Sequence, residues 1–269
     1  MTGIEIAALA GACLIAALAG LLAGALVNTL ADRVVGVDEP VWSATQCRKC
    51  GALLPPVSLL ALGELRTPRV CGNCGKRASF RRPLTQIALA LTFPLLLMHA
   101  LFNPGHPFSR HAGALPIWGI ISLGVITLTA FAFIFVVDLE HRLIYDLAIF
   151  PPMLLILGFA AFFNSATLPA LLLGGALAGL LFLLLYGLGW AIYRQEALGF
   201  GDVKLAALMG VAVGWPAVTT AIAITVAGGF ITALLLLASG AAGRRAYIPF
   251  GIFMSLATAI TLLTTPFPW

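Results

Sequence analysis

The segment LPALLLGGALAGLLFLLLYGLGW, residues 168–190, decides the class of fold. It contains no charged residue, and its length matches the roughly 20 apolar residues that a helix needs to cross a bilayer. The rest of the 269-residue chain is similar, because 61% of its residues are hydrophobic, only 9% are charged, and the mean hydropathy is +1.06. Soluble domains carry roughly 25% charged residues. The composition therefore excludes a soluble globular enzyme and predicts an all-α polytopic membrane protein.

Charged residues, prolines and glycines divide the chain into eight apolar blocks, which we interpret as transmembrane helices. The first block is longer than the roughly 7–15-residue apolar core of a signal peptide and lacks basic residues before it, so we expect a retained span. Gly20-x-x-x-Gly24 and Gly175-x-x-x-Gly179 are candidate close-packing faces between helices. The expected spans are residues 4–30, 84–102, 116–137, 147–163, 168–190, 203–213, 217–239 and 250–265, of which the sixth is short.

The basic residues are divided unequally between the two sides that eight spans define. Of the 15 Lys and Arg residues, only Arg110 falls on the side opposite the long loop 31–83. The positive-inside rule then makes this loop cytoplasmic and places both termini outside. The loop is the only segment large enough for a second domain. We therefore expect a first span at 1–30, a cytoplasmic loop domain at 31–83 and a seven-span membrane bundle at 84–269.

Four of the five cysteines form two pairs in the long loop. Cys47-Arg-Lys-Cys50 and Cys71-Gly-Asn-Cys74 are separated by the spacing that four-thiolate zinc sites use. Two disulfides are the alternative, but a cytoplasmic loop favours zinc. A closed four-thiolate site has no open position for substrate, so the zinc is expected to be structural. Cys13 is expected to serve packing, and the basic residues of the loop to face anionic lipid headgroups rather than nucleic acid.

Two acidic motifs lie at the ends of expected spans. Asp138-Leu-Glu-His-Arg-Leu-Ile-Tyr-Asp146 follows an apolar run, and Gly199-Phe-Gly-Asp202-Val-Lys-Leu205 precedes an Ala-rich span. Two spans separate the motifs, so Asp138 and Asp202 are expected at the same membrane face, where they can meet. Two carboxylates that share a site do not both ionise cheaply, so they share a proton. The ionised partner can then activate water while the protonated one polarises a carbonyl, which is the chemistry of amide hydrolysis.

Gly199 and Gly201 are expected to allow close approach or positive φ where a side chain would block the partner aspartate. The alternative is that acids at the ends of spans are solvated boundary groups, and for Asp146 we favour a helix N-cap. A different function for the same pair is a proton relay in a proton-coupled membrane transporter. The position of Asp138 and Asp202 at one face, rather than at mid-depth, favours the hydrolase.

These motifs together resemble the type IV prepilin peptidase family, the bifunctional leader peptidases and N-methyltransferases with a Gly-x-Gly-Asp aspartic site. The resemblance extends along almost the whole chain. Presenilin-like and preflagellin-type proteases share the Gly-x-Gly-Asp element, and the tetracysteine loop favours the bacterial prepilin group. The matching motifs are Gly24 with Asn28 and Arg33, the four cysteines, Phe80-Arg-Arg-Pro-Leu84, Asp138-Leu-Glu140 with Asp146 and Pro151, Gly199 to Leu205, and Ile248-Pro-Phe-Gly251.

The resemblance implies a membrane aspartic endopeptidase of the bacterial inner membrane with both termini in the periplasm. Its substrates would be prepilins or pseudopilins of a type IV pilus or type II secretion system, cut after a glycine at the cytoplasmic face to remove a basic leader. It also implies methyl transfer from S-adenosyl-L-methionine to the new N-terminal amine, although no glycine-rich nucleotide loop is visible in the sequence. The implied catalytic residues are Asp138 and Asp202, supported by Gly199, Gly201, Lys204, Asp146 and Glu140.

Overall fold

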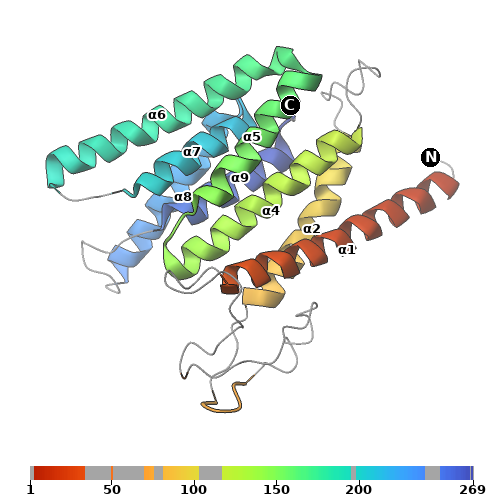
Figure 1. Cartoon of the computed structure of the whole chain (residues 1–269), viewed down its shortest axis with the longest axis horizontal. Coiled ribbons are helices and arrows are strands. Elements are labelled where there is room, and N and C mark those ends of the chain that lie inside the picture. The colour runs from red at the N-terminus through yellow and green to blue at the C-terminus, as the bar shows by residue number, and fades with distance from the viewer. Residues whose placement is uncertain are drawn as a thin grey trace. The chain divides into compact units, whose positions relative to one another are not determined.

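Most of the residues that the computed structural model describes are helical (Figure 1). The described residues are 3–33, 50, 70–75, 81–102, 117–194, 198–239, 249–266 and 268. Within them the structure contains one α-helix for each expected apolar block and no β-strand, which confirms the all-α fold class. The helices are α1 (Gly3–Arg33), α2 (Arg81–Phe102), α4 (Ile117–His141), α5 (Asp146–Phe163), α6 (Leu168–Tyr193), α7 (Phe200–Val213), α8 (Val218–Ala238) and α9 (Phe250–Thr264), with a 3-10 turn, η2, at Ser165–Thr167.

Six of these helices are long and apolar enough to cross a membrane, namely α1, α2, α4, α5, α6 and α8. The other two are shorter, since α7 has 14 residues and α9 has 15. At 1.5 Å per residue they extend about 21–22 Å, less than the roughly 30 Å hydrocarbon core. Helix α7 is almost entirely buried, and Leu205, Leu208 and Met209 have no exposed surface. Because protein surrounds α7, the bilayer thickness does not set its length.

The chain divides into two compact units, Met1–Met98 and His99–Trp269. In the first unit, Gly20 lies directly against the backbone of Leu89, and a Cβ on Gly24 would be 2.6 Å from the Cα of Gln86. The predicted Gly20 and Gly24 packing face is therefore confirmed as the contact between α1 and α2. The expected division at residues 30 and 83 stays a prediction, because most of the loop lies outside the described residues.

The same unit contains a set of buried polar side chains that we call the α1–α2 polar cluster: Asn28, Asp32, Arg81 and Arg82. The Nδ2 of Asn28 donates a hydrogen bond to the backbone oxygen of Arg82 at 3.0 Å. Both guanidinium groups contact the carboxylate of Asp32, one at each oxygen. The side chains of this ion-pair group are between 8% and 14% exposed. The cluster therefore joins the end of α1 to the start of α2.

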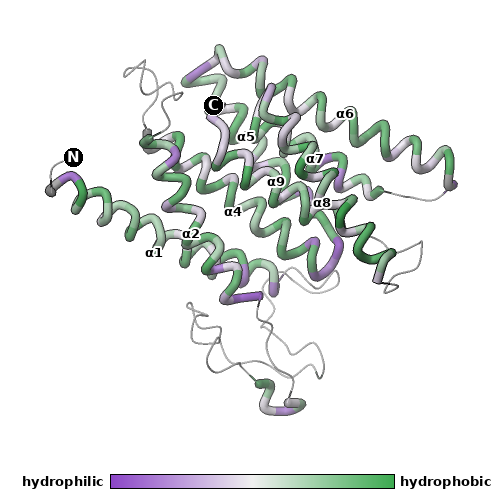
Figure 2. The backbone as a smooth tube through the Cα atoms, turned by 180° about the vertical axis from the view of Figure 1, so that it is seen from behind, coloured by the Kyte–Doolittle hydropathy of each residue, from purple (hydrophilic) through white to green (hydrophobic). Residues whose placement is uncertain are grey.

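In the second unit, α7 is the central helix and contacts α5, α6, α8 and α9, while α4 packs against α5 and α9. The turn between α4 and α5 and the start of α7 lie at the same end of this bundle (Figure 1). Figure 2 shows that its helices are hydrophobic along most of their length, with hydrophilic segments at that turn and near the start of α7. The charged residues of the bundle's described part thus lie at one end.

Small residues let α6 approach α7 closely. A Cβ on Gly174 would lie 2.5 Å from the backbone oxygen of Gly210, and a Cβ on Gly175 would lie 2.6 Å from Cγ2 of Val211. A Cβ on Gly179 would be 3.3 Å from the Cβ of Ala207. The predicted packing face at Gly175 and Gly179 is confirmed, with α7 as its partner. This contact holds in place the helix that carries Asp202.

Candidate active site

Asp138 lies in the last turn of α4, and only 2% of its surface is exposed. Its Oδ2 accepts a hydrogen bond of 3.1 Å from the backbone N–H of Ile252, the third residue of α9. Pro249, at the N-cap of α9, has no side chain that could satisfy the N–H groups of the first turn. Asp138 therefore caps α9 from a different helix, and the positive end of α9 favours its negative charge.

Gly251 makes this contact possible. A Cβ at Gly251 would lie 2.7 Å from Oδ2 of Asp138 and 2.9 Å from its Cγ. Atoms do not approach so closely, so any larger residue would displace the carboxylate. The sequence pointed to Gly251 only as part of a family motif. Sequence reasoning could not identify this role, because Gly251 acts by having no Cβ and the hydrogen bond comes from the backbone N–H of Ile252.

Asp202 is the third residue of α7 and has 3% of its surface exposed. Its Oδ2 accepts a hydrogen bond of 3.2 Å from the N–H of Gly199, and its own N–H donates to the oxygen of Gly199 at 3.0 Å. This reciprocal pair fixes the side chain at the start of the helix. Asp202 is close enough to Asp138 for the two carboxylates to interact electrostatically. Within the described part of the chain, neither carboxylate forms an ion pair.

The two glycines of the Gly-x-Gly-Asp motif act differently from what we expected. Gly199 has φ −73° and ψ 144°, which any residue can adopt. A Cβ on Gly201 would lie 3.1 Å from the Cβ of Ile144 and not against Asp138. Gly201 therefore lets the turn between α4 and α5 pack on α7. The expectation that these glycines clear space for the partner aspartate is wrong, because Gly251 does so.

Lys204 and Asp146 join the starts of α7 and α5. The Nζ of Lys204 lies 2.7 Å and 2.9 Å from the two carboxylate oxygens of Asp146, and the side chains are 29% and 56% exposed. The predicted N-cap role of Asp146 is wrong by one residue. The extended backbone of Tyr145, with φ −86° and ψ 134°, puts that residue at the cap and Asp146 inside the first turn. The carboxylate of Asp146 therefore does not cap α5 and instead forms the ion pair with Lys204.

Glu140 lies one position before the end of α4, next to His141. Its Oε2 is 3.6 Å from Nε2 of His141, and its side chain is 16% exposed. Arg142 follows with φ 56°, and its N–H donates to the backbone oxygen of Asp138 at 3.0 Å. The left-handed backbone conformation of Arg142 ends α4 directly after the turn that carries Asp138. The helix end thus brings the positive charge of Arg142 near the buried carboxylate.

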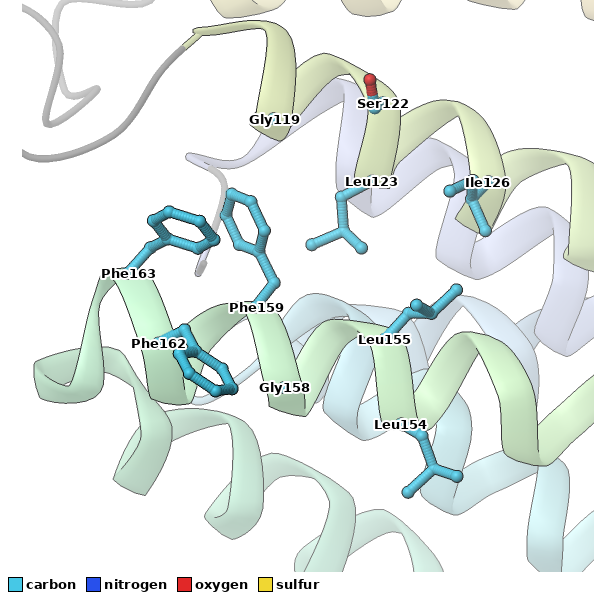
Figure 3. A pocket seen from close by; sticks show the side chains of 10 residues that line it. All are labelled: Gly119, Ser122, Leu123, Ile126, Leu154, Leu155, Gly158, Phe159, Phe162 and Phe163. Carbon is cyan, nitrogen blue, oxygen red and sulfur yellow. The ribbon is translucent and has the colours of Figure 1, made fainter.

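A pocket between α4 and α5 lies at the other end of these helices, beside Gly119 and Phe163 (Figure 3). Its lining is apolar apart from Ser122, with the rings of Phe159, Phe162 and Phe163 gathered at one side. It contains no acid, base or nucleophile of the kind that catalysis of hydrolysis needs. This pocket is therefore distinct from the site of the two aspartates.

Three of the four predicted metal ligands come together in the first unit. The sulfurs of Cys50, Cys71 and Cys74 lie within 4.8 Å of one another, and the distance from Cys50 to Cys71 is 3.6 Å. In a tetrahedron with Zn–S bonds near 2.3 Å the sulfurs are about 3.8 Å apart. The turn closes through the N–H of Gly75, which donates to the oxygen of Cys71 at 2.9 Å. The donor set fits a thiolate metal site, and Cys47 lies outside the described residues.

The fold and the site together define an integral membrane protein in which two buried carboxylates lie close enough to interact electrostatically at the ends of packed helices. Residues 125–263, just over half of the chain, match the type IV leader peptidase family. The chain belongs to this family of peptidases. The matched region contains Asp138, Asp146, Asp202, Lys204 and Gly251, whereas the cysteines lie before it.

Curated relatives carry the name prepilin leader peptidase/N-methyltransferase. The protein of this name from Pseudomonas aeruginosa is 27% identical, over 91% of this chain and 88% of that protein. Those from Myxococcus xanthus and Stutzerimonas stutzeri are 29% and 27% identical, over 84% and 78% of this chain. The chain spans only 64% and 66% of the length of these two relatives. No solved structure matches the chain.

Proposed function

We propose that this chain is a membrane aspartic endopeptidase that removes the basic leader of prepilins or pseudopilins. The observation that carries the proposal is the pair of buried acids, Asp138 and Asp202, which lie close enough to interact and form no ion pair with any of the residues that the structure describes. Membership of a leader peptidase family and the names of the relatives support the substrate class.

The proposed reaction uses both carboxyl groups and one water molecule. The ionised carboxylate takes a proton from the water as its oxygen attacks the scissile carbonyl carbon, and the protonated carboxyl group protonates the carbonyl oxygen. Collapse of the tetrahedral intermediate then breaks the C–N bond. As that bond breaks, the carboxyl group that took the proton from water gives it to the leaving amine, and the other carboxylate takes a proton from a hydroxyl group of the intermediate, which becomes the product carboxyl group. The pair thereby returns to its starting state, with one proton shared between Asp138 and Asp202.

We place this chemistry at the cytoplasmic face of the bacterial inner membrane. The basic residues Arg142, Arg194 and Lys204 lie at the helix ends that adjoin the two aspartates, and positive charge gathers on the cytoplasmic side. The apolar part of a substrate would stay in the lipid while its basic leader projects toward the cytosol. Both termini of this chain would be periplasmic.

The second proposed activity is methyl transfer from S-adenosyl-L-methionine to the amine that cleavage exposes. The methyl group would leave the sulfonium sulfur and bond to the amine nitrogen, which loses a proton. The support is the name shared by the relatives, which includes N-methyltransferase. We assign no residues to this activity.

We also propose that Cys47, Cys50, Cys71 and Cys74 bind one structural zinc ion that folds the loop at 31–83. The distances among the three described sulfurs support this. The purified protein should contain about one zinc per chain, because four thiolates close one tetrahedral site. Cys47→Ser with Cys71→Ser should remove the metal, while the matched Cys13→Ser should keep it. Unchanged metal in the double variant would refute the zinc site.

The test of the peptidase is mass spectrometry of a leader-bearing pilin precursor after incubation with the purified protein, with and without S-adenosyl-L-methionine. We expect loss of the leader in both reactions and one added methyl group only with the donor. Asp138→Asn and Asp202→Asn should each insert in the membrane yet leave the precursor intact. Cleavage by either variant would contradict the proposal. No cleavage by the wild type, together with proton flux in liposomes that depends on Asp138, would favour the transporter.

A further inference from the structure

The two carboxylates of the site occupy opposite ends of their own helices. Asp202 lies in the first turn of α7, where the helix dipole favours a negative charge. Asp138 lies in the last turn of α4, where the dipole of its own helix opposes one. Burial opposes the charge as well, since Asp138 is 2% exposed. An ionised Asp138 therefore needs stabilisation from outside α4.

The first turn of α9 supplies that stabilisation. The Ile252 N–H donates to Oδ2 of Asp138, and the absence of a side chain at Gly251 brings the whole carboxyl group within van der Waals contact of the helix terminus. Hydrogen bonds to a charged group are stronger than those to a neutral one, so this contact is worth more to the ionised carboxylate. A small displacement of α9 would remove both features together.

Few other charges act on the pair among the described residues. The positive charge of Arg142, which follows the end of α4, interacts electrostatically with Asp138, and the charge of Asp138 interacts electrostatically with Asp202. Helices α8 and α9 carry no titratable side chain. On α5 the only one is Asp146, which is bound to Lys204 of α7, and on α6 Tyr186 packs against Phe200. The repulsion between the two aspartates is therefore opposed mainly by backbone N–H groups.

We infer that the first turn of α9 is a positioning element that stabilises the ionised form of Asp138, so that Asp138 can act as the base that activates water. Gly251 and Ile252 are positioning residues, because they act on the reaction through Asp138. This inference rests on the proposed peptidase function and names the role of one of its two acids.

The test compares the pH dependence of precursor cleavage in two variants and their controls. Gly251→Ala pushes the carboxylate away from α9. Ile252→Pro removes the donating N–H in the first turn of a helix, where proline is tolerated. Gly158→Ala is the control for the first, because a Cβ there has no neighbour within 4 Å. Ile252→Ala is the control for the second, because it keeps the N–H. Thermal unfolding in detergent identifies variants that do not fold.

Both variants should lower kcat with little change in KM, because no substrate contact is lost. Loss of a hydrogen bond to a charged group should also move the acid limb of the pH–rate profile upward by about one to two pH units. Gly158→Ala should keep the wild-type profile, and Ile252→Ala, which retains the N–H, should leave the acid limb at its wild-type pH whatever its rate. A folded Ile252→Pro protein with the wild-type acid limb would overturn the inference while leaving the peptidase intact. Absence of cleavage by the wild type at any pH would instead overturn the peptidase, and the inference with it.

Discussion

Among the described residues, acids with little solvent exposure occur in two regions, and their charges are satisfied in different ways. In the α1–α2 polar cluster, the carboxylate of Asp32 contacts two guanidinium groups. At the ends of α4 and α7, Asp138 and Asp202 interact electrostatically with each other and accept hydrogen bonds from backbone N–H groups. An acid bound to cations keeps its charge and fixes the geometry of its helices. Two acids that share a site instead retain a proton that can move, which is what hydrolysis requires.

The largest expected difference between the two regions is in stability. Asp32→Asn removes the carboxylate that both Arg81 and Arg82 contact, and removal of one partner from a buried ion pair costs about 3–5 kcal/mol. Asp138→Asn relieves repulsion and keeps an oxygen that can accept from Ile252, so its unfolding free energy should change by less than about 1 kcal/mol. Denaturant unfolding in mixed micelles measures the unfolding free energy of both variants. Equal losses in the two variants would remove the distinction between the regions.

The sequence predicted the helices better than it predicted the partners of the acids. Apolar runs located every described helix because the bilayer demands long uncharged segments, but they could not show that α7 is an interior helix. Counting spans predicted that Asp138 and Asp202 lie at one membrane face, and the structure has the turn after α4 and the start of α7 at the same end of the bundle. The contact of Asp138 with the first turn of α9 was not predictable, since Ile252 contributes only a backbone N–H and Gly251 only empty space. Asp32 was overlooked because an acid beside Arg33 looks like an ordinary boundary residue.

A second prediction concerns the packing that places Asp202. Gly174→Ala would put a methyl group 2.5 Å from the backbone oxygen of Gly210 and force α6 away from α7. Overpacking of this kind costs about 1–3 kcal/mol. The unfolding free energy and the cleavage rate should therefore fall together. Gly187→Ala, on the same helix with no neighbour within 4 Å, should be neutral or slightly stabilising. Similar losses in both variants would mean that helix propensity, not packing, sets the effect.

The smallest effect is expected at the exposed pair of Lys204 and Asp146, which resembles the α1–α2 polar cluster in its charges but not in its burial. Solvent screens this pair, so Lys204→Met should change the unfolding free energy by less than about 1 kcal/mol. Cleavage should fall only a few-fold if the pair merely aligns α5 with α7. A loss of cleavage as large as that of Asp202→Asn would instead give Lys204 a direct part in the reaction.

The most direct test of the central claim is a double-mutant comparison of precursor cleavage. Asp138→Asn, Asp202→Asn and the variant with both changes are measured in the same membranes by mass spectrometry. If the two acids work as one proton-sharing pair, each single change should reduce the rate by about 100-fold or more, and the double change should reduce it little further. Appreciable cleavage by either single variant, or losses that multiply in the double variant, would contradict the account.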